Sequence, residues 1–481
     1  MQLTPHQNEA LSKLKDFIQG EEHQLFVLSG YAGTGKTTLV SHLVQWLQDQ
    51  KIGSRLLATT GRAAKVLQDK TKLNCDTLHS EIYEFSSVNA GEKDDDADLE
   101  PGQMSLNFGL KSKPKVFDMQ VYIVDESSMI SHLKSSGKSV TNFGTGSVLN
   151  DFLTHVDKDK VIFVGDPCQL PPISDDPFSS ALSPSFLAKH YEKGATGFEL
   201  KEIIRQAEAS QILTLAGKFR QDINRGHFVK YPKVPAITGK QSFLYKNEYK
   251  LVDAYMARVK QSDGFLNSTM IASTNKQCHH LNANFRHRIF KKYELQVGEL
   301  LMVVQNNYIV PLTNGDQVLV EKVKFHKKLA GFTFLEVKLK QIHSGKSHEM
   351  LMIKELLYSP NANLNKDEMQ RLLISYDKRA RQRGHKRNSK AYLDGMKDDK
   401  YLNALRCKFS YAITCHKSQG GEWDEVFLNI YKSLYAFRGE SLYRWYYTAI
   451  TRAKEKIHIN DGWWVEGFDR RRMAQKNVKR N

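Results

Sequence analysis

The segment Gly30-Tyr31-Ala32-Gly33-Thr34-Gly35-Lys36-Thr37 constrains the fold of this chain more than any other part of the sequence. It fits the pattern G-x-x-x-x-G-K-[ST], which wraps around the phosphates of a nucleoside triphosphate when it joins a strand to a helix. Both neighbours are present, because the apolar run Leu25 to Leu28 precedes it and Lys36 to Leu47 follows with helical apolar spacing. The pattern therefore predicts a P-loop at the end of a buried parallel strand.

The residue types in this segment explain the expected chemistry. Glycines let backbone N–H groups close around phosphates, and the helix N-terminus adds its positive end. Lys36 is expected to reach the β- and γ-phosphates, and the Thr37 hydroxyl to ligate Mg²⁺. The predicted nucleotide-binding residues here are Gly30, Ala32, Gly33, Thr34, Gly35, Lys36, Thr37 and Thr38.

Two further apolar strands end in polar residues suited to hydrolysis. The run Val121 to Val124 is followed by Asp125, predicted to hold the metal ion, and Glu126, predicted to orient and deprotonate the attacking water. The run Val161 to Val164 is followed by GDPCQLPP, in which Gln169 is placed to sense a γ-phosphate and the prolines fix the turn. The three strand ends together predict a site for nucleotide hydrolysis.

The remaining apolar runs predict an α/β architecture with two cores. They are Arg55 to Ala58, Met270 to Ala272, Val426 to Leu428 and Ile457 to Ile459. Short buried strands that alternate with helical spacing are typical of parallel sheets. The series is interrupted at residues 80–117 and 306–405, where strand-like alternation around Val318 to Val323 and Phe332 to Leu339 gives way to a basic stretch. Two cores, each with an insertion, are the simplest interpretation.

The composition favours a polyanionic partner. The 481 residues correspond to about three domains, and the net charge of +17 with a pI near 9.3 indicates nucleic acid or an acidic membrane surface. No apolar run approaches the ~18 residues of a membrane span. The N-terminal segment MQLTPHQNEALSKLKDF is polar, without the apolar stretch typical of a signal peptide, so we do not expect export. The five scattered cysteines show no metal-ligand spacing and are expected to be reduced thiols.

The charge is unevenly distributed. From Gln370 onward there are 25 Lys and Arg against 12 Asp and Glu, so +13 of the +17 lies in the last quarter. The densest basic run is DKRARQRGHKRNSK at residues 377–390, and the most acidic is EKDDDADLE at residues 92–100. Neither has a sustained apolar period, so both are predicted to be exposed loops or insertions.

Ten segments in order resemble those of superfamily 1B helicases, the RecD-like and Dda-like branch. They are LTPHQ, GYAGTGKTT, ATTGRAAKVL with TLH, VDESSM, GDPCQLPP, EIIRQ, ASTN, LTNGDQV, YAITCHKSQGGEWDEV and YTAITRAKE. The resemblance covers nearly the whole chain, and TCHKSQG followed by YTAITRA is its most specific part. It implies two tandem RecA-like P-loop NTPase cores that use ATP and Mg²⁺.

The resemblance also assigns residues outside the P-loop. Gln7 would recognise the adenine, and Gly420 would contact the nucleotide. Arg205 and Arg452 would be arginine fingers from the second core, which stabilise charge on the transferring phosphoryl group. The residues implied to contact DNA are Gly61, Arg62, Thr77, His79, Pro171, Thr414 and His416. His79 and His416 fit structural hydrogen bonding equally well.

The resemblance divides the chain into four parts. Core 1A would comprise residues 1–79 and 118–193, and core 2A residues 194–305 and 406–481. Insertion 1B, residues 80–117, would contain a pin hairpin with the acidic loop, and Tyr83, Phe85 or Phe108 would meet the duplex junction. Insertion 2B, residues 306–405, would be SH3-like, with the basic run as a phosphate-binding tail.

The expected function is an ATP-dependent single-stranded DNA translocase and 5′-to-3′ DNA helicase that acts at single-strand/duplex junctions as a monomeric motor. An RNA helicase is an alternative, because 2′-OH recognition is not visible in the sequence. A DNA-dependent ATPase that remodels nucleoprotein without unwinding is a second alternative, and a non-enzymatic switch is disfavoured by Glu126. We expect no membrane association and a cytoplasmic, nucleoid-associated location in a bacterial or phage system.

Overall fold

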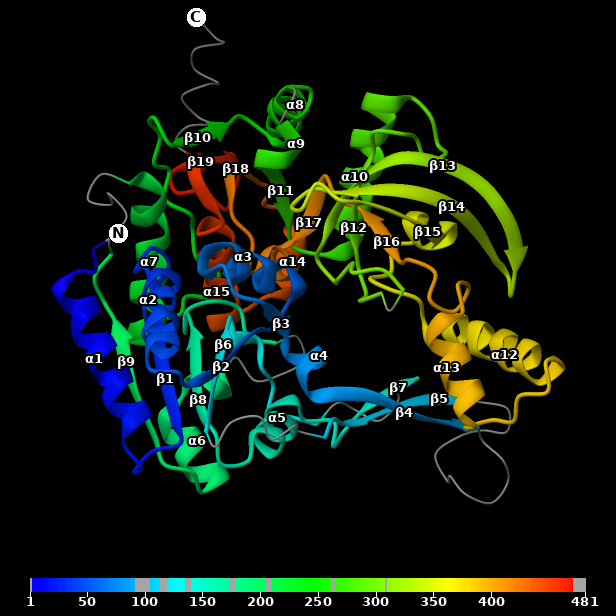
Figure 1. Cartoon of the computed structure of the whole chain (residues 1–481). Helices are drawn as coiled ribbons and strands as arrows, with labels where there is room; N and C mark the ends of the chain where they lie inside the picture. The colour runs from blue at the N-terminus through cyan, green and yellow to red at the C-terminus, as the bar shows by residue number, and fades with distance from the viewer. Residues whose placement is uncertain are drawn as a thin grey trace, which may run out of the picture.

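The protein, seen in a computed structural model, is built around two parallel sheets, a five-stranded antiparallel sheet and a three-stranded mixed sheet (Figure 1). The structure describes residues 2–90, 104–112, 119–134, 140–172, 178–203, 210–261, 264–307 and 309–469. Among the helices in these ranges, none is long and apolar enough to cross a membrane. The acidic run at residues 92–100 lies outside the described residues.

The first sheet has six parallel strands in the order β3-β2-β6-β8-β1-β9. Its strands are β1 (Leu25–Gly30), β2 (Gly53–Ala58), β3 (Cys75–Thr77), β6 (Gln120–Asp125), β8 (Lys160–Gly165) and β9 (Ala195–Leu200). All four strands predicted in this part of the chain are confirmed. β1 lies beside β8, so the P-loop and the GDPCQLPP segment emerge from neighbouring strands.

Helices cover both faces of this sheet because buried side chains alternate along each strand. Phe26 and Leu28 of β1 pack with the first three helices, while Leu25 and Val27 pack with α5 and α6 on the other face. The helices are α1 (Pro5–Gln19), α2 (Lys36–Asp49), α3 (Gly61–Thr71), α5 (Val148–Val156) and α6 (Pro184–Tyr191), with short 3-10 turns η1 (Ser127–Met129) and η2 (Ser180–Leu182). The predicted helix after the P-loop is α2.

The second sheet has five parallel strands in the order β10-β19-β18-β11-β17. They are β10 (Ser242–Tyr245), β11 (Ser268–Ala272), β17 (Ala412–Thr414), β18 (Trp423–Leu428) and β19 (Ala453–Asn460). The surrounding elements are α7 (Gln211–Arg225), α8 (Glu248–Val259), α9 (Gly264–Asn267), α10 (Asn275–Phe290), α14 (Cys415–Ser418), η3 (Lys432–Ala436) and α15 (Glu440–Ile450). The strands predicted at 270–272, 426–428 and 457–459 are confirmed.

The insertion in the first core forms a hairpin of β4 (Tyr83–Ala90) and β5 (Met104–Leu110), preceded by α4 (Leu78–Ile82). A third strand, β7 (Thr141–Phe143), pairs parallel with β5 and comes from outside the expected range 80–117. The hairpin reaches away from the first sheet toward α12 (Lys366–Gln382) and α13 (Lys390–Asp398) (Figure 1).

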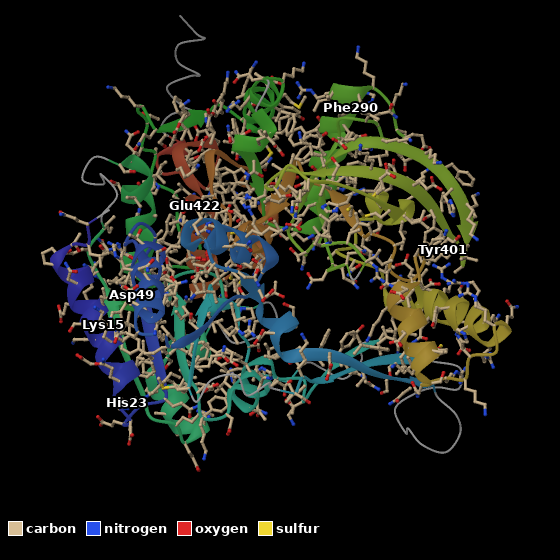
Figure 2. The ribbon with its side chains drawn as sticks, viewed as in Figure 1. Lys15, His23, Asp49, Phe290, Tyr401 and Glu422 are labelled. Atoms are coloured by element: carbon tan, nitrogen blue, oxygen red, sulfur yellow. The ribbon has the colours of Figure 1, made fainter. Side chains whose placement is uncertain are left out.

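The insertion in the second core combines an antiparallel sheet with helices. The sheet order is β15-β14-β13-β12-β16, with β12 (Leu300–Val303), β13 (Gln317–Leu329), β14 (Phe332–Gln341), β15 (Ser347–Ile353) and β16 (Cys407–Phe409). Strands β12 and β16 lie just outside the expected range 306–405. Helices α11 (Lys354–Tyr358), α12 and α13 follow β15 and were not predicted. Tyr401, labelled in Figure 2, packs its ring against Phe334 of the sheet.

The prediction that the basic run is an exposed loop is wrong for its first part. α12 continues to Gln382, and it begins with a capping box in which Asn365 and Glu368 each accept a backbone N–H from the other. The apolar period that supports this helix lies at Met369, Leu372, Leu373, Tyr376 and Ala380. Most of these apolar residues precede the basic run at residues 377–390. The run taken alone therefore lacks the apolar spacing of a helix.

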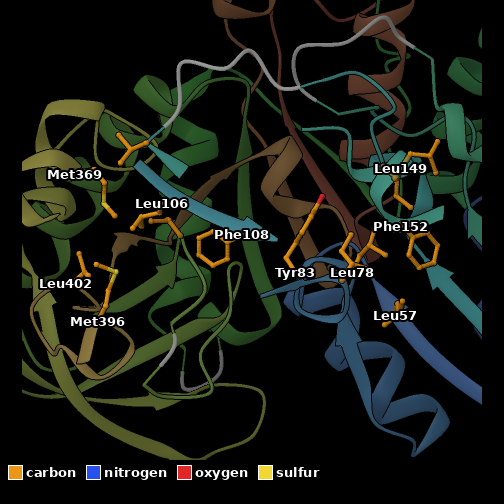
Figure 3. Packing of buried hydrophobic residues seen from close by; sticks show 14 of the residues in the cluster. Leu57, Leu78, Tyr83, Leu106, Phe108, Leu149, Phe152, Met369, Met396 and Leu402 are labelled. Atoms are coloured by element: carbon orange, nitrogen blue, oxygen red, sulfur yellow. The ribbon is translucent and has the colours of Figure 1, made fainter. Parts of the chain in front are cut away.

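One hydrophobic cluster joins the first core to the second insertion. Figure 3 shows it passing from Leu57 and Phe152 in the first core, through Tyr83 and Phe108 of the hairpin, to Met396 of α13. Because buried apolar contacts are continuous along this path, the hairpin is packed at both ends.

Candidate functional site

A cavity of about 290 Å³ lies between the two parallel sheets and collects most of the predicted nucleotide residues. The predicted residues that line it are Gln7, Ala32, Gly33, Gly35, Lys36, Thr37, Thr38, Asp125, Glu126, Gln169, Gly420 and Arg452. Gly30 ends β1 and Thr34 is buried beneath the loop, so neither lines the cavity. Arg205 lies outside the described residues.

The P-loop has the geometry expected of a phosphate-binding turn. Gly33 and Gly35 have φ values of 85° and 76°, a left-handed conformation that favours glycine, and Gly35 is the N-cap of α2. The Lys36 ammonium donates to the carbonyl oxygens of Gly30 at 2.7 Å and Tyr31 at 3.1 Å. These internal bonds have to be exchanged for phosphate contacts when a nucleotide enters.

Gln7 reaches the same loop from α1. Its side-chain Nε2 donates to the carbonyl oxygens of Thr34 at 3.3 Å and Gly35 at 3.5 Å. A capping box with Thr4 fixes the helix end that carries it. The glutamine is therefore anchored at the edge of the cavity, next to the backbone that would surround the phosphates.

Two acidic residues at the end of β6 line the cavity together with the P-loop. Asp125 accepts a hydrogen bond from the Glu126 backbone N–H at 2.9 Å, and Glu126 adopts a left-handed φ of 54°. Burial and the Asp125 charge raise the pKa of Glu126 to about 7, while Arg452 and Lys36 oppose that shift. Burial also raises the pKa of Asp125. A carboxyl tuned near neutrality suits a general base.

The residues present fit a Mg²⁺ ion bound together with the nucleotide. Both the Thr37 hydroxyl and the Asp125 carboxylate line the cavity, and Mg²⁺ prefers a few protein oxygens completed by phosphates and water. This is the pair that the sequence predicts as metal ligands.

Arg452 enters the cavity from the second core. It is only 4% exposed, and its guanidinium donates to the Thr448 carbonyl at 3.1 Å, the Gly421 carbonyl at 3.3 Å and the Thr451 hydroxyl at 3.2 Å. These bonds hold a cation near Glu126 and Gln169, where charge would develop on a transferring phosphoryl group.

The sequence did not identify several residues of this cavity. Gln2, Val66, Lys70 and Glu422 also line it, and Glu422 is labelled in Figure 2. Val66 and Lys70 lie one turn apart on α3, which carries the GRAAKVL segment. Their helical spacing, on the face next to the P-loop, could have identified them as cavity residues from the sequence. No sequence pattern marks Gln2 or Glu422 in this way.

A second, larger cavity of about 630 Å³ runs between the hairpin and the second insertion. Three predicted strand-contacting residues, Gly61, Thr77 and His79, lie on its first-core wall. Aromatic rings continue that wall at Tyr83, Phe85, Phe108 and Phe143. The opposite wall, which the sequence did not predict, contains Gln305, Asn306, Met369, Met396, Lys397, Leu402, Asn403 and Arg406.

Four other residues predicted to bind DNA lie elsewhere. The Arg62 guanidinium stacks over the Trp423 ring at 4.0 Å, and burial lowers its pKa to about 10. Thr414 caps α14 and lines a separate small cavity, and burial lowers the pKa of His416 in that helix. Pro171 is buried. None of these four lines the larger cavity whose wall carries His79.

Three arginines of the basic run are paired with carboxylates of the protein. Arg379 bonds Asp399 with both guanidinium ends, one of them at 3.0 Å. Asp377 accepts from Arg387 at 2.8 and 3.0 Å and lies 3.0 Å from Arg381. Burial raises the pKa of Asp377, but Arg387, the Tyr392 hydroxyl and Arg381 together outweigh burial, and the net shift is downward. The expectation of a free phosphate-binding tail is therefore wrong for Arg379, which ties α12 to the end of α13, and for Arg387, which ties the segment between these helices to α12. Arg381 pairs with Asp377 within α12, and its side chain is exposed.

Family comparisons match the first parallel sheet and part of the second. A family of AAA domains matches residues 2–234, and a UvrD-like helicase C-terminal domain matches residues 409–459. The first match contains the P-loop, the acidic pair and Gln169, and the second contains Gly420 and Arg452.

Individual relatives extend this likeness. The ATP-dependent DNA helicase dda of Enterobacteria phage T4 is 26% identical over 304 residues, covering 63% of this chain and 61% of that protein. An uncharacterised protein of Methanocaldococcus jannaschii is 23% identical over 479 residues, covering 91% of this chain and 36% of its own length. The chain thus spans about a third to three fifths of the length of these relatives.

Solved structures of Pif1 helicases share the fold. One, of Pif1 at forked duplex DNA, has a TM-score of 0.51 and 16% identity, covering 99% of this chain and 98% of that one. Another, Pif1 from Bacteroides with ADP-AlF3 and single-stranded DNA, has a TM-score of 0.50 and 18% identity with the same coverage. These likenesses confirm the predicted α/β fold with two RecA-like cores.

Proposed function

We propose that this chain is a superfamily 1B helicase of the Pif1-like and Dda-like kind, an ATP-dependent motor that moves 5′ to 3′ on single-stranded DNA and separates duplexes. The observation that carries the proposal is the cavity between the cores. It brings the first-core residues Lys36 and Glu126 together with Arg452 of the second core. Hydrolysis at such a site depends on how closely the two cores approach.

The residues have separable roles in this proposal. Lys36 leaves the carbonyls of its own loop to bind the phosphates, and Thr37 and Asp125 hold the Mg²⁺ that helps neutralise phosphate charge. Glu126 takes a proton from the attacking water, and Gln169 orients that water against the γ-phosphate. Arg452 stabilises the charge of the transferring group. Arg205 is proposed as a second finger by resemblance.

The larger cavity is proposed to hold the tracked strand. Gly61, Thr77 and His79 lie on one wall, and Lys397 and Arg406 supply positive charge from the other. Phosphates attract the cationic wall and bases stack on aromatic rings, which together bind single strands without sequence preference. Arg62, Pro171, Thr414 and His416 do not line this cavity, so an indirect contribution fits their positions better than direct contact with the strand.

The hairpin is proposed to divide the duplex at its aromatic side. Tyr83 donates to Asp151 at 2.7 Å, and Phe108 stacks on Phe143 at 4.8 Å, so both are held within the wall. Phe85 is less buried and lines the same cavity, which makes it the best candidate to meet the junction. We also propose the four-part domain division, a monomeric motor and a cytoplasmic, nucleoid-associated location.

Unwinding of tailed duplexes tests the proposal directly. A duplex with a 5′ single-stranded tail should be separated with ATP and Mg²⁺, whereas an equal duplex with a 3′ tail should not. ATPase stimulation by single-stranded DNA and by RNA of the same sequence distinguishes DNA from RNA as the substrate. Stimulation without strand separation from either tail would instead favour a nucleoprotein remodeller.

A further inference from the structure

Helix α15 of the second core presents three polar side chains to the GDPCQLPP loop of the first core. Arg444, Tyr447 and Thr448 are three and four residues apart, so they share one face of the helix. All three are buried, with exposures of 8%, 2% and 0%. The helix therefore contacts the loop through side chains that are buried from bulk water.

Two of these side chains hold the loop by its backbone. The Arg444 Nη1 donates to the carbonyl oxygens of Pro167 and of Gln169, the latter at 3.1 Å. The Thr448 hydroxyl accepts the backbone N–H of Leu170 at 3.0 Å. Arg444 is itself oriented by Glu440, which accepts from its Nε at 2.8 Å. The peptide group between Gln169 and Leu170, and the one between Pro167 and Cys168, are thus bonded to the second core.

Tyr447 links the same loop to the P-loop. Its hydroxyl donates to the Asp166 carboxylate at 2.6 Å and accepts the backbone N–H of Ala32 at 3.1 Å. Burial, followed by the Asp166 charge, raises the pKa of Tyr447 well above its ordinary value, so the hydroxyl keeps its proton and remains the donor. One hydroxyl of the second core therefore joins two loops of the first.

The Gln169 side chain is left free for a ligand. It lines the nucleotide cavity and is 4% exposed, and among the described residues its Oε1 has no hydrogen-bond partner. A buried amide oxygen without a partner is costly unless a bound molecule or water satisfies it. The backbone of Gln169 is thus fixed by α15, while its side chain points to where the γ-phosphate and water would be.

We propose that Arg444, Tyr447 and Thr448 are positioning residues that align Gln169 for hydrolysis only while the two cores are closed. The inference rests on the proposed function and deepens it. Core separation would break the bonds from α15 to the loop together, so the loop would lose its alignment at the same moment as Arg452 withdraws. The alignment of Gln169 then depends on closure of the two cores, as the position of Arg452 does.

Tyr447→Phe tests this inference with Tyr446→Phe as its matched control. Tyr446 is the adjacent buried tyrosine, and its hydroxyl has no hydrogen-bond partner within the described residues. Arg444→Gln tests the backbone contacts, and Arg444→Lys, which can keep one of them, should restore part of the lost activity. Thermal unfolding of each variant checks that it is folded.

The decisive readout compares the affinity for MgADP with that for MgADP plus aluminium fluoride, which mimics the transferring phosphoryl group, without DNA. Tyr447→Phe and Arg444→Gln should bind MgADP within about twofold of the wild type but lose about tenfold in preference for the fluoride complex, since positioning acts on the transition state. With single-stranded DNA, kcat should fall about tenfold while KM stays within about twofold. Tyr446→Phe should match the wild type.

Two results distinguish a failure of the positioning role from a failure of the proposed function. If both variants keep the wild-type preference for the fluoride complex, the positioning role is refuted. It is also refuted if each variant loses affinity for MgADP and for the fluoride complex by the same factor. If the wild-type ATPase is not stimulated by single-stranded DNA, the proposed function fails, while the fluoride comparison still decides the role of α15.

Discussion

The side-chain amide of Gln370 in α12 pairs with the backbone of Met104 in β5. Its Oε1 accepts the Met104 N–H at 2.8 Å, and its Nε2 donates to the Met104 carbonyl. Asn388 makes the same two-sided contact with Val88 on β4, at 2.9 and 3.1 Å. The hairpin is therefore held by side chains that act like an added strand.

Gln370→Leu should weaken unwinding more than ATP turnover. The substitution leaves two buried backbone groups of Met104 without partners, which costs about 1–3 kcal/mol each and loosens the hairpin. We expect unwinding of a 5′-tailed duplex to fall about fivefold, with ATPase stimulated by single-stranded DNA within about twofold of the wild type.

A change at the hairpin tip is the control for Gln370→Leu. Replacing residues 91–103 with a short Gly/Ser turn removes the acidic run but keeps Met104 and its contacts. This variant should unwind nearly as well as the wild type, because acidic side chains repel a phosphate backbone. Loss of unwinding in the tip variant alone would mean that the acidic loop, not the anchored aromatic side, divides the duplex.

Lys36→Ala should abolish ATP turnover and leave binding of single-stranded DNA largely intact. The lysine lines the cavity between the cores, and the larger cavity proposed for the strand is lined by other residues. Steady-state ATPase and fluorescence anisotropy with a labelled oligonucleotide measure the two properties. A parallel loss of DNA affinity in a folded variant would contradict this separation of sites.

Arg452→Ala should bind nucleotide without hydrolysing it. Loss of an arginine finger costs about 10³-fold or more in kcat, because the charge of the transferring group is left unstabilised. Lys454→Ala is the matched control, since Lys454 lies two residues away and pairs with Asp424 at the surface. Normal turnover in Arg452→Ala would refute the finger assignment.

The basic run should separate into structural and strand-binding residues. Arg379→Gln removes one partner of a half-buried ion pair and should destabilise the fold by on the order of 2 kcal/mol.

Arg383 and Lys386 are exposed, and if both contact phosphates, their joint change to Gln should flatten the salt dependence of single-strand binding by about 1.4 in log–log slope. An unchanged slope would leave this run with a structural role only.

Stability should fall below neutral pH because of His458. Its ring is stacked between Phe427 and Phe243, with centroids 4.1 and 4.9 Å away. Burial lowers its pKa from 6.5 to about 4, although the Glu425 contact opposes the shift. The unfolded chain therefore binds the proton more readily, so this contribution is complete above pH 6.5 and is lost as the pH falls toward 4.

The measurement is the pH dependence of Tm for the wild type and for His458→Gln. The variant should show a flatter decline between pH 6.5 and 4, because the buried titrating group is gone. His280→Gln changes an exposed histidine and should keep the wild-type profile. Equal slopes in all three proteins would exclude His458 as the source.

The short motifs predicted the fold and the ATP cavity because their chemistry is local. A glycine loop between β1 and α2 needs no distant residue to form, and an apolar strand that ends in Asp125 and Glu126 places them at the edge of a sheet. Parallel strands bring such ends together, so the meeting of Lys36, Glu126 and Gln169 follows once the strands are recognised.

Only the tertiary structure decided how the charged and polar residues between the motifs are used. Arg379 and Arg387 look available for phosphate in the sequence, but folding brings each to a carboxylate of the same helical unit. Likewise, nothing in the sequence placed Arg62 on Trp423, or Arg444 and Tyr447 on the loop that carries Gln169. The physical reason is that hydrogen bonds and ion pairs depend on approach within a few ångströms. Apolar periodicity sets which faces are buried, but it does not set which polar groups meet across them.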